Sequence, residues 1–149
     1  MKSGLITYFA YGANLDLSGM RRRCPNHERL SRATLPDHRL VFRGVADVEP
    51  ASGEFVQGAL YRITPQHLRS LDSFEGYPRL YIRKELMVVP EAGEPVMATL
   101  YQMNGRQGYS PPHNGYLDII LAGYRDWGIP EEYLRSIIKA AAASHFGEY

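Results

Sequence analysis

Two short segments hold the residue types that could do chemistry, and the first runs from Tyr8 to Leu15. Its aromatic residues predict a strand that ends at Gly12, and Asn14 is then a natural N-cap for a following helix. A junction of this kind aims successive backbone N–H groups at one point, where they could bind a carboxylate or a developing oxyanion. The same residues also suit a plain structural connection, so the segment alone leaves both interpretations open.

The second segment surrounds Glu75, which stands between bulky Phe74 and flexible Gly76. The pattern predicts a short helix that ends here, before the pair Tyr77-Pro78. A carboxyl group packed among aromatic side chains has a raised pKa and can act as a general acid and base. The alternative interpretation is an exposed glutamate beside a helix-capping glycine.

The remaining reactive side chains lack the spacing that familiar catalytic or metal sites need. The five histidines show no metal-ligand spacing, and a P-loop, a dinucleotide fingerprint and a Gly-x-Ser-x-Gly elbow are all missing. Cys24 has no assigned histidine or acidic partner, which favours an incidental thiol over a nucleophile. Arg21–Arg23 fall in the last turn of an expected helix, where we interpret them as a solvated face. We therefore expect no metal and no cofactor.

The composition is typical of one folded domain. The chain has 149 residues, 44% hydrophobic and 22% charged, and 17 basic residues against 16 acidic ones leave a net charge of +1. We therefore expect a single domain over residues 1–149 with neither a nucleic-acid nor a membrane partner. One cysteine, no leader-like N-terminus and no long apolar run predict a cytoplasmic protein.

The elements that must position the two segments follow one another along the chain. The expected strands are Leu5–Tyr11, His38–Arg43, Phe55–Thr64, Leu80–Val89 and Pro95–Met103. The expected helices are Leu15–Arg23, Pro65–Phe74, Tyr116–Trp127 and Pro130–Ala143. Thr64 is the expected N-cap of the second helix, and Gly58 predicts a bulge or a close backbone approach within the third strand. Strands followed by a helical end predict an α+β domain whose sheet curls into a barrel.

Four short motifs are spread over nearly the whole chain. They are Tyr-x-x-Tyr-Gly-x-Asn-Leu at 8–15, Val56–Tyr61, Leu71–Gly76 followed by Tyr81 and Arg83, and Tyr116-Leu117 leading to Gly128–Tyr133. Each motif is short, but the ordered set is specific, and it resembles the signature of the γ-glutamylcyclotransferase-like family. Within that family, residues 74–78 look most like the γ-glutamylamine cyclotransferase type.

This resemblance implies a small mixed β-barrel of about five to six strands flanked by helices. It also implies an enzyme that cyclises the glutamyl part of γ-glutamyl amides to 5-oxoproline, with Glu75 as the catalytic residue. The implied substrate-binding residues are an anchoring loop and two pocket tyrosines: Tyr11, Gly12, Ala13, Asn14, Leu15, Tyr101 and Tyr116. Many members have serine where this chain has Ala13, which keeps the backbone N–H groups but removes a hydroxyl.

The implied reaction needs no nucleophile from the protein, because the substrate's own α-amine attacks its γ-carbonyl. Glu75 would take the amine proton and return one to the leaving nitrogen, while Tyr101 and Tyr116 donate hydrogen bonds in the pocket. The expected partner is a small-molecule γ-glutamyl substrate, and the expected assembly is a monomer or a homodimer. Two alternatives stay open: a γ-glutamyl-protected secondary metabolite as the substrate, and a binding module of the same fold without turnover.

Overall fold

The computed structural model describes residues 4–105 and 108–146, which form a closed barrel in the strand order β1-β3-β2-β4-β5. The strands are β1 (Ile6–Ala10), β2 (Glu28–Phe42), β3 (Ala46–Ile63), β4 (Tyr81–Pro90) and β5 (Val96–Met103). Neighbouring strands run antiparallel, except that β5 lies parallel to β1 and so closes the barrel. The α+β class and the barrel expected from the sequence are confirmed.

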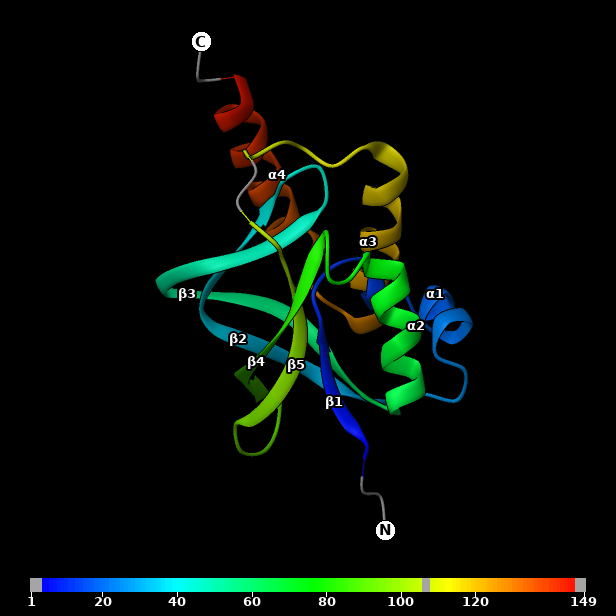
Figure 1. Cartoon of the computed structure of the whole chain (residues 1–149). Helices are drawn as coiled ribbons and strands as arrows, with labels where there is room; N and C mark the ends of the chain where they lie inside the picture. The colour runs from blue at the N-terminus through cyan, green and yellow to red at the C-terminus, as the bar shows by residue number, and fades with distance from the viewer. Residues whose placement is uncertain (1–3, 106–107, 147–149) are drawn as a thin grey trace.

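Four helices and one 3-10 turn flank the barrel in the described part of the chain. They are η1 (Ala13–Leu15), α1 (Leu17–Arg23), α2 (Pro65–Glu75), α3 (Asn114–Trp127) and α4 (Glu131–Phe146). Helices α1, α2 and α3 lie together on one side of the barrel (Figure 1). Thr64 caps α2 as predicted, because its hydroxyl accepts a hydrogen bond from the His67 N–H at 3.0 Å. Within the described residues, no helix is long and apolar enough to cross a membrane.

Strands β2 and β3 are much longer than the strands expected at His38–Arg43 and Phe55–Thr64. Pro36 and Asp37 look like strand breakers in the sequence, but the structure absorbs them in a register shift where Asp37 takes a φ of 57°. A bulge bends a strand pair without ending it. The pairing therefore continues to a tight turn, and β3 already begins at Ala46, one of the residues that line the candidate site.

Large buried side chains fill the interior of the barrel and join it to the helices. Tyr61 is fully buried, and the Trp127 ring of α3 packs edge-on against it with centroids 5.5 Å apart. The backbones of β1 and β3 approach closely at Gly58, where an added Cβ would lie 2.2 Å from the Ala10 carbonyl oxygen. The close approach predicted at Gly58 is thus confirmed.

Candidate active site

A small pocket lies where the end of β1 meets the C-terminus of α2. It is lined by Tyr8, Tyr11, Gly12, Ala13, Asn14, Ala46, Glu75, Tyr81, Tyr101 and Tyr116. The structure therefore brings Glu75 together with loop residues 11–14 and with both tyrosines named from the sequence. Leu15 is not among the lining residues: it is fully buried, and its carbonyl accepts a hydrogen bond from the Trp127 indole N–H at 3.0 Å.

Glu75 is the last residue of α2, and its placement follows from how that helix ends. Gly76 takes φ 71° and ψ 34°, a left-handed conformation that suits glycine, and its N–H bonds back to the Ser73 carbonyl. The Glu75 side chain is half-buried, and burial raises its pKa to about 7, although the Arg23 charge and the Asn14 hydrogen bond act in the opposite direction. Near neutral pH the carboxyl is therefore divided between its two protonation states, as a group that accepts and then donates a proton requires.

The Asn14 side chain connects Glu75 to two further residues. Arg23 Nε donates to Asn14 Oδ1 at 2.9 Å, and because a guanidinium only donates, this bond fixes the orientation of the amide. The amide nitrogen then donates to Glu75 Oε1 at 3.0 Å and to the Tyr8 hydroxyl at 2.8 Å. The N-cap role expected for Asn14 is wrong, because the 3-10 turn delays the start of α1 and the Asp16 carboxylate caps it instead.

The anchoring loop, residues 11–15, contains backbone N–H groups that make no hydrogen bond to the described residues. The N–H groups of Leu15 and Asp16 bond to the carbonyls of Gly12 and Ala13 at 3.1 and 3.2 Å. In the described part of the chain, the N–H groups of Gly12, Ala13 and Asn14 have no protein acceptor. Unsatisfied donors at the start of a helical turn suit an anionic group. Ala13 leaves them intact, as expected for a loop that works through its backbone.

The two tyrosines named from the sequence use their hydroxyl groups differently. Tyr116 accepts a hydrogen bond from the Ala46 N–H at 3.0 Å, so its own proton remains available to a ligand. Tyr101 instead donates to Asp72 Oδ1 at 2.7 Å, which commits its proton to the protein. With this bond in place, the Tyr101 hydroxyl faces a ligand as an acceptor, and a donor role for Tyr101 stays a prediction. Burial raises the pKa of both hydroxyls, which keeps them neutral.

Several residues of the site went unnoticed in the sequence. Tyr8 and Tyr81 line the pocket and stand within recognised motifs, so those motifs held the signal that could have found them. Ala46 contributes its backbone, since its N–H bonds to Tyr116 and its carbonyl accepts from the Tyr81 hydroxyl. A lone alanine in a sequence gives no sign of such a role.

Arg23 corrects the interpretation of the arginine run as a solvated face. Arg21 and Arg22 are exposed, but Arg23 is half-buried and its guanidinium carbon lies 3.8 Å from the centroid of the Phe74 ring. A run of arginines carries no signal for which member turns inward, because that depends on where α2 packs.

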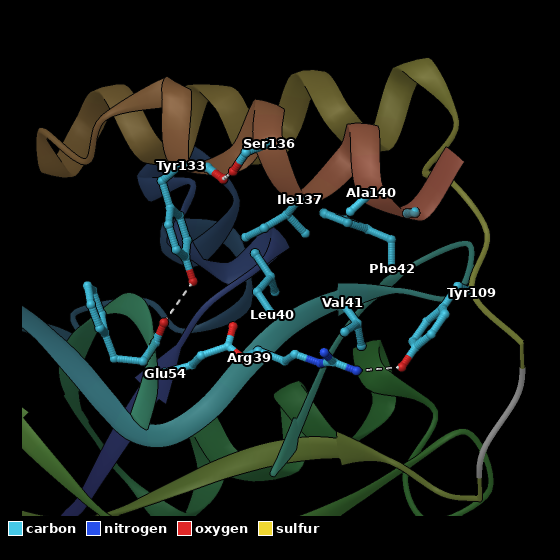
Figure 2. A pocket seen from close by; sticks show the side chains of 12 residues that line it. Arg39, Leu40, Val41, Phe42, Glu54, Tyr109, Tyr133, Ser136, Ile137 and Ala140 are labelled. Atoms are coloured by element: carbon cyan, nitrogen blue, oxygen red, sulfur yellow. Dashed lines mark hydrogen bonds between the residues drawn. The ribbon is translucent and has the colours of Figure 1, made fainter. Parts of the chain in front are cut away.

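A larger hollow of about 360 Å³ lies between α4 and the β2–β3 ribbon, and none of the site residues lines it. Figure 2 shows its polar groups bonded to the protein: the Tyr133 hydroxyl donates to the Phe55 carbonyl at 3.3 Å, and Arg39 donates to the Tyr109 hydroxyl at 3.0 Å. The rest of the lining is largely apolar. The acid–base chemistry that Glu75 could perform is therefore confined to the smaller pocket.

A metal site is not evident in the part of the chain that the structure describes, since no group of three or more His, Cys, Asp or Glu side chains is placed to hold an ion. The donor set of the pocket is instead one carboxyl, one amide, several hydroxyls and backbone N–H groups. Such a set suits an organic ligand with both an anionic and a polar end.

Comparison with known proteins identifies the family. Residues 8–127 match the family described as "Gamma-glutamyl cyclotransferase, AIG2-like". The chain belongs to this family. Human γ-glutamylcyclotransferase is 30% identical over 139 residues, which cover 85% of this chain and 73% of the relative. Human γ-glutamylaminecyclotransferase is 32% identical over 117 residues, covering 63% and 72%. A solved structure named γ-glutamyl cyclotransferase has a TM-score of 0.79 at 27% identity and covers 89% of this chain and 86% of that one.

Membership in the γ-glutamyl cyclotransferase, AIG2-like family confirms the resemblance stated from the motifs. The matched residues include the anchoring loop, Glu75 and both pocket tyrosines. Relatives named γ-glutamylcyclotransferase and γ-glutamylaminecyclotransferase both match. The comparisons therefore support the general cyclotransferase family and do not distinguish between its two types.

Proposed function

We propose that the chain is an enzyme that cleaves γ-glutamyl amides and releases 5-oxoproline together with a free amine or amino acid. The observation that carries this proposal is the position of Glu75, a carboxyl group with a pKa of about 7 that lines one pocket with the anchoring loop and Tyr116. The names of the human relatives support the same class of reaction.

The first step is an intramolecular attack. A γ-glutamyl amide folded inside the pocket brings its α-amine to its γ-carbonyl carbon, so that the nucleophile comes from the substrate. As the new C–N bond forms, the amine nitrogen gives a proton to the Glu75 carboxylate and the carbonyl oxygen takes up the negative charge. The hydrogen bond from Asn14 holds Glu75 Oε1 in place during this transfer.

The second step expels the leaving group. The tetrahedral carbon re-forms its carbonyl as the bond to the amide nitrogen breaks, and protonated Glu75 returns the proton to that nitrogen. The products are 5-oxoproline, a five-membered lactam, and the free amine. One carboxyl group therefore serves both steps, and it is regenerated as a carboxylate.

Binding falls to the remaining groups of the pocket. The N–H groups of Gly12–Asn14 supply donors for the substrate carboxylate or for the oxyanion, both of which are anionic. Tyr116 adds a hydroxyl proton, while the Tyr8 hydroxyl already accepts from Asn14 and so keeps its proton for a ligand. The neutral, buried tyrosines exclude water from the reacting atoms.

The test is release of 5-oxoproline from a panel of γ-glutamyl-alanine, γ-glutamyl-ε-lysine and glutathione by the parent and by Glu75→Gln. The substitution keeps an acceptor for Asn14 but removes the titrating group, so we expect kcat to fall roughly 100-fold or more while the fold persists. Glu94→Gln is the matched control, because Glu94 is exposed in the turn between β4 and β5 and should leave the rate unchanged.

The outcomes separate the proposal from its alternatives. Turnover that survives Glu75→Gln would remove this residue from the mechanism. A parent that binds 5-oxoproline or a γ-glutamyl ligand yet releases nothing from the panel would favour the binding module or a γ-glutamyl-protected secondary metabolite.

A further inference from the structure

Tyr61 does not line the pocket, yet its hydroxyl group bonds to the anchoring loop. The residue belongs to β3 and is fully buried, and burial raises the pKa of its hydroxyl, which therefore stays protonated. That hydroxyl donates to the Asn14 carbonyl at 2.8 Å and also reaches the Leu15 carbonyl at 3.4 Å. Among the residues that the structure describes, no other donor bonds to the Asn14 carbonyl. One buried hydroxyl thus holds the main chain of Asn14.

Three aromatic rings pack against the Tyr61 ring. The Trp127 indole and the His27 imidazole each meet it edge-on, with centroids 5.5 and 5.0 Å away, and the Tyr8 ring stacks on it at 6.2 Å. Trp127 also donates from its indole N–H to the Leu15 carbonyl at 3.0 Å, so two side-chain donors hold the same turn. Close packing of this kind fixes the direction of the Tyr61 hydroxyl.

Asn14 transmits this constraint to Glu75. Its backbone carbonyl accepts from Tyr61, and its side-chain amide nitrogen donates to Glu75 Oε1 at 3.0 Å. A buried carbonyl without a donor is costly, so the main chain of Asn14 would shift if Tyr61 lost its hydroxyl. The amide would move with the main chain, and a hydrogen bond weakens as its distance and angle depart from the optimum. Loss of the Tyr61 bond therefore weakens the hydrogen bond to Glu75 as well.

We propose that Tyr61 is a positioning residue, whose hydroxyl holds Asn14 so that the Asn14 amide stays bonded to the Glu75 carboxyl group. This inference rests on the proposed function, because it assigns Tyr61 a part in the reaction of Glu75. The hydrogen bond from Asn14 lowers the Glu75 pKa, against the effect of burial. The ionisation of Glu75 therefore reports whether Asn14 is held in place.

Other titratable groups also interact with Glu75 and must stay the same in a test. They lie on α1, on α3, on β4, on β5 and in and just after β1: Arg23, Tyr8, Tyr11, Tyr81, Tyr101 and Tyr116. Of these, only Arg23 is charged near neutral pH, because burial raises the pKa of each tyrosine. Tyr61→Phe removes none of these groups.

The test follows the titration of Glu75 without any turnover. In protein labelled with carbon-13 at the glutamate carboxyl carbon, the Glu75 signal is the one that Glu75→Gln lacks. For Tyr61→Phe we expect the titration midpoint to rise by roughly half a pH unit to one unit, as the weakening of one hydrogen bond to a carboxylate would give. We also expect kcat to be roughly two- to fivefold lower near pH 7 and to approach the parent value as pH rises, because Glu75 is then ionised in both proteins.

Tyr124→Phe is the matched control, because it also removes one hydroxyl from a buried ring. Tyr124 is fully buried in α3, and its hydroxyl has no hydrogen-bond partner in the described part of the chain. The titration midpoint of Glu75 in this variant should equal that of the parent. Trp127→Phe removes the second side-chain donor to the turn and should raise the midpoint too, so the test does not depend on the folding of Tyr61→Phe.

Asn14→Ala separates a role through Asn14 from a general loosening of the fold. Without the Asn14 amide, the Tyr61 hydroxyl has no route to Glu75. Adding Tyr61→Phe to Asn14→Ala should therefore raise the midpoint no further.

Every outcome bears on the role of Tyr61 or on the proposed function. An unchanged midpoint in folded Tyr61→Phe, or in Trp127→Phe where Tyr61→Phe does not fold, would overturn the role of Tyr61. A further rise of the same size in the Asn14→Ala background would overturn it as well. Both results would leave the proposed function standing, because 5-oxoproline release is measured separately. A parent that titrates as expected but releases no 5-oxoproline would overturn the proposed function, and with it the part of Tyr61 in a reaction.

Discussion

The pKa of Glu75 is set by opposing effects of its surroundings. Burial raises its pKa to about 7, while the Arg23 charge and the Asn14 hydrogen bond pull the pKa down. Without those two partners the pKa of the carboxyl would be higher, and a smaller fraction would be ionised at neutral pH. The site therefore depends on a residue from α1 and one from the loop as much as on Glu75 itself.

This balance predicts the pH dependence of the reaction. The carboxylate is the form that begins the cycle, so kcat should fall as pH drops through about 7. Replacing Arg23 by Gln removes a charge that lowers the Glu75 pKa, so this limb of the profile should move to higher pH. A pH series of kcat for the parent, Arg23→Gln and Arg22→Gln measures it. A limb at the same pH in all three proteins would show that Arg23 does not set the ionisation of Glu75.

At the level of elements, the ends of a helix could be predicted from the sequence where a capping residue marks them. Thr64 caps the start of α2 as the sequence predicted. Gly76 caps its end, as the alternative interpretation of this segment had it, and the two caps place Glu75 at the helix terminus. The full length of β2 and β3 is not evident in the sequence, because proline and aspartate are uncommon inside strands and only pairing with a partner strand shows that a bulge accommodates Pro36 and Asp37. The start of α1 was misplaced for a similar reason, since a 3-10 turn differs from a helix N-terminus only in three dimensions.

The contact between β1 and β3 at Gly58 predicts the effect of a single methyl group. In Gly58→Ala the new Cβ would meet the Ala10 carbonyl, a backbone atom that cannot rotate away, and the Phe9 ring at 2.7 Å. We expect a loss of about 2 kcal/mol or more in the free energy of unfolding, measured by urea denaturation. Activity should fall as well, because β1 leads directly into the anchoring loop.

Gly108→Ala is the matched control for that substitution. None of the residues that the structure describes lies within 4 Å of an added Cβ at Gly108, so the free energy of unfolding of Gly108→Ala should stay close to that of the parent. Equal stability of Gly58→Ala and Gly108→Ala would mean that β1 and β3 can separate without cost at this point.

For the whole molecule, the pocket exists only because the barrel closes. Tyr8 of β1 and Tyr101 of β5, the two strands whose parallel pairing closes the barrel, both line one pocket with Glu75. The family motifs named most of these residues, yet the sequence held no information on which hydroxyl donates to the protein and which faces the pocket. That depends on contacts such as Tyr101 with Asp72, which join β5 to α2 across the assembled fold.

Closing the barrel around Glu75 also has a cost in stability that depends on pH. The pKa of Glu75 is raised to about 7 from an ordinary value of 4.5, so its protonated form favours the folded state. That contribution is fully present below about pH 4.5 and is lost as pH rises through about 7. Glu75→Gln stays neutral throughout. Its free energy of unfolding should therefore increase relative to that of the parent between pH 5 and pH 8, as measured by urea denaturation at both values.

Glu94→Gln, at an exposed position, should show no such relative increase. A constant difference between parent and Glu75→Gln across this range would mean that the pocket does not disfavour the ionised carboxylate, and the assignment of Glu75 as a base tuned to neutral pH would fail.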